Sequence, residues 1–127
     1  MYLKMVEMFK NKIMNKLLLG ILLFFLGQGL IWIQTNGQFI WKWAKDNPLG
    51  MSLIFSIPIS YGFIYATTYV VEYFEGQLWP GRFIGFGTGM VAFSILTWYF
   101  MGEGITSKTA VSLVLASTLV LIQILWK

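Results

Sequence analysis

The sequence predicts an all-α fold: a polytopic membrane protein built as a four-transmembrane-helix bundle with a short amphipathic N-terminal segment. The main observation is four apolar stretches that contain no Asp, Glu, Lys or Arg, at residues 17–33, 49–71, 83–101 and 110–126. At a rise of about 1.5 Å per residue, each stretch can cross or nearly cross a hydrocarbon core of roughly 30 Å. Composition agrees, because 57% of the residues are hydrophobic and only 11% are charged. A small water-soluble domain needs about twice that charged share.

The first sixteen residues differ in composition from the apolar stretch after them. Their apolar side chains recur at a helical spacing, with lysines largely elsewhere, at Tyr2, Met5, Val6, Phe9 and Ile13. This pattern predicts a short helix lying in the membrane interface at residues 1–16, followed by one transmembrane domain at residues 17–127. Two alternatives stay open. Met14 is a possible natural start, and residues 14–26 also fit a secretory signal with a weak small-x-small cleavage site after them.

The distribution of cations predicts the orientation. With four crossings, both termini and the middle connector share one side of the membrane. That side carries six cationic residues, Lys4, Lys10, Lys12, Lys16, Arg82 and Lys127, and the other side carries three, Lys42, Lys45 and Lys108. The positive-inside rule therefore predicts cytoplasmic termini in a bacterial-type inner or plasma membrane.

The connectors carry turn and interface signals. The first, at residues 34–47, has an Asn-Gly turn and then Trp41 and Trp43, whose indoles favour the headgroup level. The second contains Trp79, Pro80 and Gly81, which suit an interface anchor and a helix start. The third, at residues 102–108, predicts a tight reversal between two antiparallel helices.

Candidate solute-binding residues come from the first two stretches. Gln28 is the polar side chain at depth in the first stretch, and the second has a Ser stripe, a mid-span Pro58 and a Tyr stripe at a spacing of four. We expect a solute to contact Gln28, Ser56, Ser60, Tyr61 and Tyr65 through hydrogen bonds and aromatic faces. The alternative is that these side chains serve interhelical packing.

The third stretch opens with glycines four residues apart, Gly81, Gly85 and Gly89. Overlapping small-xxx-small patterns allow a close helix–helix approach, so these residues are expected to serve helix packing or oligomer formation. The expected partner is either the fourth stretch, through Ser112 and Ala116, or the same helix of a second subunit.

Several functions are disfavoured by composition. The chain has no Cys and no His, and its five carboxylates lie in termini, connectors or helix ends. No catalytic residue, metal ligand or cofactor is therefore expected, and the protein is not predicted to be an enzyme. The net charge of +4 comes largely from the N-terminal segment, which indicates a membrane surface and not a nucleic acid as the partner.

A resemblance covers about thirty residues of the last two stretches. An aromatic-rich helix end at residues 97–101, a Gly-Glu turn, a Thr-containing link and a final aliphatic helix resemble the end of a repeat in the drug/metabolite transporter superfamily. Chain length and layout are similar to its single-repeat four-helix members, such as the small multidrug resistance transporters. The resemblance implies a dimeric transporter, antiparallel or parallel. The multidrug branch relies on a Glu in its first helix, which this chain lacks, so no site residue and no proton coupling is carried over.

These observations lead to two expectations. The first is a small integral membrane protein of transporter-like architecture that binds or moves a small amphiphilic or neutral solute. The alternative is a non-transporting structural or accessory subunit that oligomerises or docks a larger membrane complex. Expected partners are the lipid bilayer and a second copy of the chain or another membrane protein.

Overall fold

The computed structural model describes residues 1–126, and within that range every regular element is a helix. The elements are α1 (Tyr2–Asn36), the short 3₁₀ helix η1 (Gly37–Phe39), α2 (Lys42–Asp46), α3 (Pro48–Tyr73), α4 (Trp79–Met101) and α5 (Ser107–Leu125). Four of them, α1, α3, α4 and α5, are long and apolar enough to cross a membrane. The predicted all-α fold is confirmed, and each predicted apolar stretch lies inside one of these helices, apart from Trp126 just beyond α5. Lys127 lies outside the described residues.

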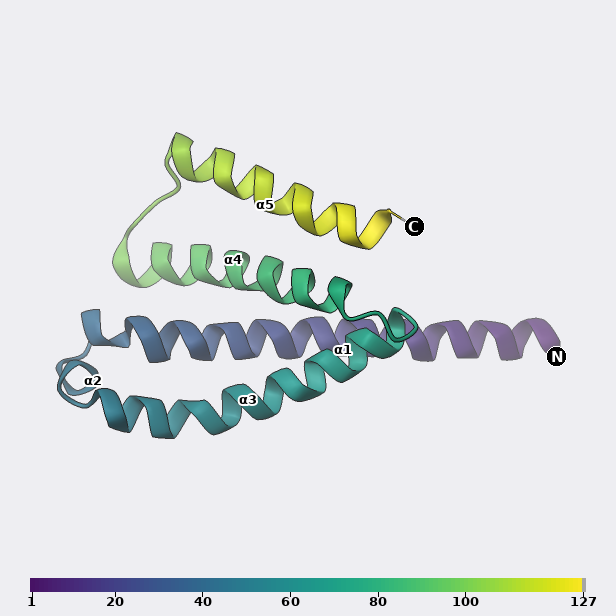
Figure 1. Cartoon of the computed structure of the whole chain (residues 1–127), viewed down its shortest axis with the longest axis horizontal. Helices are drawn as coiled ribbons and strands as arrows, with labels where there is room; N and C mark the ends of the chain where they lie inside the picture. Colours follow the sequence, from purple (N-terminus) through teal and green to yellow (C-terminus); the bar gives the residue numbers. More distant parts are fainter. Residues whose placement is uncertain (127) are drawn as a thin grey trace.

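The long helices lie in an open row. Figure 1 shows α1 between α3 and α4, with α5 on the far side of α4. No residue of α5 is buried. The two edge helices, α3 and α5, therefore each leave one face without a neighbouring helix in the part of the chain that the structure describes.

The N-terminal segment is continuous with the first apolar stretch. The sequence predicts a separate short helix at residues 1–16, but α1 runs without a break from Tyr2 to Asn36 and projects beyond the other helices at its N-terminal end (Figure 1). Its 35 residues correspond to a length of about 52 Å. No Gly or Pro precedes Gly20, so no helix-breaking residue interrupts α1 at the predicted boundary between residues 16 and 17.

The core forms where α1, α3 and α4 meet. It consists of Phe24 from α1, Ala66 and Val70 from α3, and Ile84 from α4. Gly20 permits this meeting, because a Cβ atom there would lie 2.7 Å from Val70 Cγ2 and 3.1 Å from the Ala66 carbonyl oxygen. The backbones of α1 and α3 are therefore as close as glycine alone allows.

Pro58 and Gly102 interrupt the regular helical backbone, the first inside α3 and the second at the end of α4. Pro58 lies inside α3 and cannot donate to the carbonyl of Ile54, and α3 bends toward α1 along its second half (Figure 1). Gly102 ends α4 in the left-handed conformation, with φ of 67°. The link from there to Thr106, which caps α5 by accepting from the Thr109 amide, contains no regular structure. It is an extended connection, not the expected tight reversal.

Candidate functional site

A cavity of about 780 Å³ lies between α1, α3 and α4, and Leu119 of α5 also reaches it. The walls are mainly apolar and aromatic, and they include Phe24, Phe63, Phe83, Phe86, Met90 and Leu119. Its polar lining comes from Gln28 on α1, Thr67 on α3, and Trp79 and Arg82 at the start of α4. The cavity is thus a predominantly apolar space with a few polar groups, as is usual for small-molecule sites.

Gln28 is the polar group that α1 contributes. Its Nε2 donates a hydrogen bond of 2.9 Å to the main-chain carbonyl oxygen of Gly85, which also accepts from the Thr88 hydroxyl at 2.9 Å. Within residues 1–126 no donor reaches the Oε1 atom of Gln28. The amide is therefore held in place through its nitrogen, and its oxygen remains available as an acceptor beside the cavity.

Arg82 supplies a cation to the same cavity. It follows Trp79 and Pro80 in the first turn of α4, and its side chain is exposed. The ion pair in the described residues joins Lys16 and Glu72, 2.6 Å apart, and Arg82 takes no part in it. A guanidinium group that pairs with no carboxylate among residues 1–126 is well suited to bind an acceptor-rich group from outside the chain.

The glycines of α4 face α1 and α3. A Cβ at Gly85 would lie 3.2 Å from the Phe24 ring, and one at Gly89 would lie 2.9 Å from the Gln28 amide. A Cβ at Gly81 would approach Val70 of α3 at 3.6 Å. Neither partner expected from the sequence, α5 or a second copy of α4, occupies this face.

The helix α5 instead meets a different face of α4, where Gly87 lies. Gly87 lies between Gly85 and Gly89 in sequence, and a Cβ there would lie 3.0 Å from Val120 on α5. Residues two positions apart on an α-helix point about 200° away from each other. The helix α4 therefore presents Gly85 and Gly89 to α1 and Gly87 to α5. The sequence pattern predicted the close approach but did not distinguish the face that meets α1 from the face that meets α5.

The serines of α3 lie outside the cavity lining. Ser56 accepts a hydrogen bond of 3.4 Å from Nε2 of Gln34 on α1, and Ser60 is exposed. Both occupy the helical face that continues along α3 to Phe63 and Thr67. Thr67 is the hydroxyl on this face that lines the cavity. It was not among the predicted solute-binding residues, although its helical spacing from Ser60 is a signal that could have identified it.

The tyrosines of α3 point away from the cavity. Tyr61 is 64% exposed and Tyr65 is 43% exposed, and their ring centroids lie 5.1 Å apart. Of the five predicted solute-binding residues, the structure thus places Gln28 alone at the cavity. Residue spacing identifies which side chains share a helical face, but it does not reveal which face meets a neighbour.

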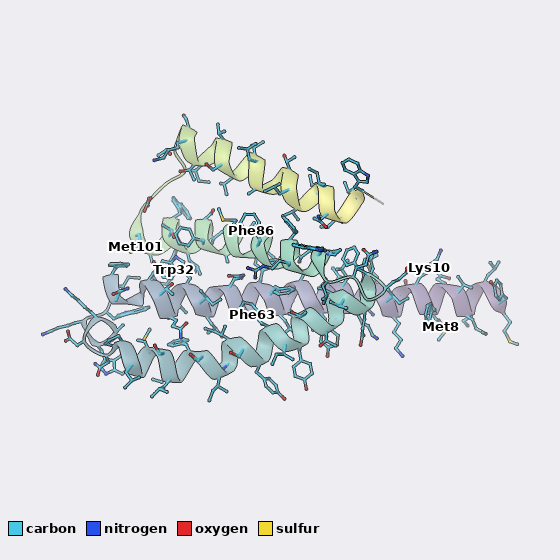
Figure 2. The ribbon with its side chains drawn as sticks, viewed as in Figure 1. Met8, Lys10, Trp32, Phe63, Phe86 and Met101 are labelled. Carbon is cyan, nitrogen blue, oxygen red and sulfur yellow. The ribbon has the colours of Figure 1, made fainter. Side chains whose placement is uncertain are left out.

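Other polar contacts are structural. Nε1 of Trp32 donates to the Thr97 hydroxyl at 2.9 Å, and both side chains are buried between α1 and α4, where Figure 2 places Trp32. Phe63, also labelled in Figure 2, lies between α3 and α1. No group of three or more acidic side chains suitable for a metal ion occurs in the described residues.

Comparisons with protein-family models, with curated proteins and with solved structures give no match to this chain.

Proposed function

We propose that this chain is a small integral membrane protein of transporter-like architecture that binds, and moves within the membrane, a small amphiphilic solute. The observation that carries the proposal is the cavity between α1, α3 and α4, which combines aromatic walls with Gln28 and Arg82. An amphiphile matches both parts of this lining better than a wholly neutral polar solute does.

Placement in the membrane rests on the surface of the molecule. Long apolar side chains are exposed along all four long helices, for example Leu22, Leu53, Phe93 and Leu115. A water-soluble monomer rarely exposes apolar patches of this extent, because each costs hydration free energy. Lipid tails remove that cost, and the cation distribution favours cytoplasmic termini in an inner or plasma membrane.

The polar lining suggests which end of the solute binds where. Arg82 and Trp79 lie in the first turn of α4, and Gly85, one turn further on, packs against Phe24 of α1. The guanidinium therefore lies near the edge of the apolar region, where a long side chain reaches the headgroup level. An acceptor-rich head beside Arg82 would leave the apolar part of the solute against Phe24, Phe63 and Phe83.

Movement of a solute requires the cavity walls to shift. The cavity lies between α3 and α4, which contact each other far less than either contacts α1. Pro58 weakens the hydrogen-bond ladder of α3, so α3 is the wall best able to bend away from α4. Gln28 remains fixed to α4 through Gly85 and supplies a constant acceptor.

The accessory-subunit alternative has its own support. α5 has no buried residue, and a helix with so little packing gains stability from a partner membrane protein. This alternative does not require a ligand in the cavity. Binding measurements therefore separate the two proposals.

The test uses the full chain in lipid nanodiscs and three probes with the same twelve-carbon tail: dodecyl phosphate, dodecyl maltoside and dodecyltrimethylammonium. We expect dodecyl phosphate to bind most tightly and to raise the unfolding temperature most. Arg82→Gln should reduce its affinity about tenfold or more, because a charge-assisted hydrogen bond contributes about 1.5–3 kcal/mol. Lys108→Gln is the matched control. Lys108 is in the first turn of α5, after the link that follows the C-terminal end of α4, whereas Arg82 lies at the N-terminal end of α4.

A second pair of variants tests the amide. Gln28→Leu should weaken binding, whereas Gln34→Leu, which removes the same group from the same helix away from the cavity, should leave it unchanged. Equal affinity for all three probes, or no effect of Arg82→Gln and Gln28→Leu, would contradict solute binding at this cavity and favour the accessory role. Flux of the bound probe between the leaflets of proteoliposomes then tests movement.

A further inference from the structure

The outer face of α3 carries a second row of residues at coiled-coil spacing. Positions 54, 58, 61, 65, 68 and 72 alternate in steps of four and three, which is the spacing of the a and d positions of a heptad. They are Ile54, Pro58, Tyr61, Tyr65, Thr68 and Glu72, and all six are exposed in the chain. We call them the tyrosine seam.

The opposite face of α3 has a seam of the same kind that is already in use. Ile59, Ala66 and Val70 are buried on that side, and Ala66 and Val70 meet Gly20 of α1. The helix α3 therefore packs one seam against α1, and its tyrosine seam faces away from the other three long helices. The second seam has no neighbouring helix within residues 1–126.

Lipid is a poor environment for the tyrosine seam. Tyr61 is at the middle of the 26-residue α3, too deep to belong to an interfacial aromatic belt. Its hydroxyl and that of Tyr65 carry two O–H donors, and bonding to each other uses one of them. Pro58 also leaves the Ile54 carbonyl without its helical donor, and no side chain in the described residues replaces it. Unpaired polar groups at this depth are costly, so the face requires a polar cover.

We propose that a second copy of this chain covers the tyrosine seam, in a parallel dimer with α3 packed on α3 about a two-fold axis along the membrane normal. This inference rests on the membrane placement in the proposed function, but not on solute binding. In a parallel two-fold pair, each seam residue faces its own copy. Among polar side chains, a hydroxyl satisfies its identical partner because it both donates and accepts. Tyr61 and Tyr65 meet that requirement.

The charge at the end of the seam is compatible with this pairing. Glu72 would face its own copy across the axis, and two carboxylates there would repel each other. Lys16 of α1 pairs with Glu72 at 2.6 Å, so each protomer brings a neutralised pair to the interface. The bias of six cations to three on the two sides sets a single orientation and so favours the parallel arrangement over the antiparallel one.

Disulfide trapping tests the inference directly, because the chain has no native cysteine. Tyr61→Cys and Tyr65→Cys, each purified and reconstituted in liposomes at high lipid-to-protein ratio, should form a product of twice the chain mass on mild oxidation. The matched control is Val114→Cys, which is as exposed as Tyr61 but lies on α5 at the other edge of the row. It should stay monomeric. Cross-linking of Val114→Cys as efficient as that of Tyr61→Cys, or none at either tyrosine position, would overturn the proposal.

A second measurement avoids any effect of cysteine on folding. The double variant Tyr61→Phe/Tyr65→Phe keeps both rings and removes both hydroxyls, and it should weaken dimerisation in liposomes about eightfold, for two hydrogen bonds of average strength between membrane helices. Tyr99→Phe, an exposed hydroxyl on α4, is the control and should leave the dimer fraction unchanged. Equal effects of the two substitutions would count against the seam. Dodecyl phosphate binding, measured in parallel, reports separately on the proposed function.

Discussion

The Gln28 side chain donates a hydrogen bond of 2.9 Å to the main-chain carbonyl oxygen of Gly85. The bond joins α1 to the glycine face of α4 beside the cavity between α1, α3 and α4. A Cβ at Gly89, one turn further along α4, would lie 2.9 Å from the same amide. The absence of side chains at Gly85 and Gly89 is therefore what allows the Gln28 amide to reach the backbone of α4.

Replacing Gly20 by Ala should destabilise the fold by about 1–3 kcal/mol, the usual cost of inserting a methyl group into a packed interface. The new Cβ would meet Val70 Cγ2 at 2.7 Å and the Ala66 carbonyl oxygen at 3.1 Å, and a backbone atom cannot move aside cheaply. Unfolding in detergent micelles, followed by circular dichroism, measures the loss.

The control for that prediction is Gly29→Ala in the same helix. Nothing lies within 4 Å of a Cβ at Gly29, and Ala has the higher helix propensity by about 1 kcal/mol. This variant should be unchanged or slightly more stable. A similar loss for both variants would mean that α1 and α3 do not meet at Gly20.

Removing the indole donor of Trp32 should cost about 1–2 kcal/mol. Trp32 is 2% exposed, so Trp32→Phe leaves the Thr97 hydroxyl buried without its donor. Stacking on Phe100, with centroids 5.5 Å apart, is largely retained. Thr97→Val and the double variant complete a mutant cycle, and a coupling energy near zero would show that the hydrogen bond does not form. Trp126→Phe, at an exposed position, is the control.

Proton coupling through a carboxylate is not expected if this protein moves a solute. Glu72 pairs with Lys16 at the end of α3, where both side chains remain more than one third exposed, and such pairs contribute little. Glu72→Gln and Glu75→Gln should leave flux in proteoliposomes unchanged, with or without an imposed pH gradient. Concentrative uptake that follows the pH gradient and disappears in Glu72→Gln would identify this carboxylate as the coupling group.

Both ends of the chain should be cytoplasmic. A single cysteine in Trp126→Cys should resist an impermeant maleimide added outside intact cells, whereas one in Glu103→Cys, on the extended link after α4, should react. The physical reason is the excess of Lys and Arg on the side that holds the termini. The reverse labelling pattern would invert the orientation, and equal labelling of both sites would indicate mixed insertion.

The sequence alone predicted the number and type of the long helices and the approximate limits of α3, α4 and α5, but not the start of α1 at Tyr2. Apolar runs without charge are set by local composition, and their ends coincide with Pro48, Trp79 and Gly102, whose effects on the backbone are also local. The glycine spacing in α4 likewise predicted a close approach, because a missing side chain is visible in the sequence itself.

Tertiary structure decided which helix meets which, and therefore which polar residues share a site. Every long helix here is apolar on nearly all sides, so periodicity gives no preferred inner face. The close contact of Gly20 with Val70 and of Gly89 with Gln28 places α1 between α3 and α4. That arrangement brings Gln28, Thr67 and Arg82 to one cavity and leaves Tyr61 and Tyr65 outside it. Such choices depend on shape complementarity between residues far apart in sequence, which no local pattern encodes.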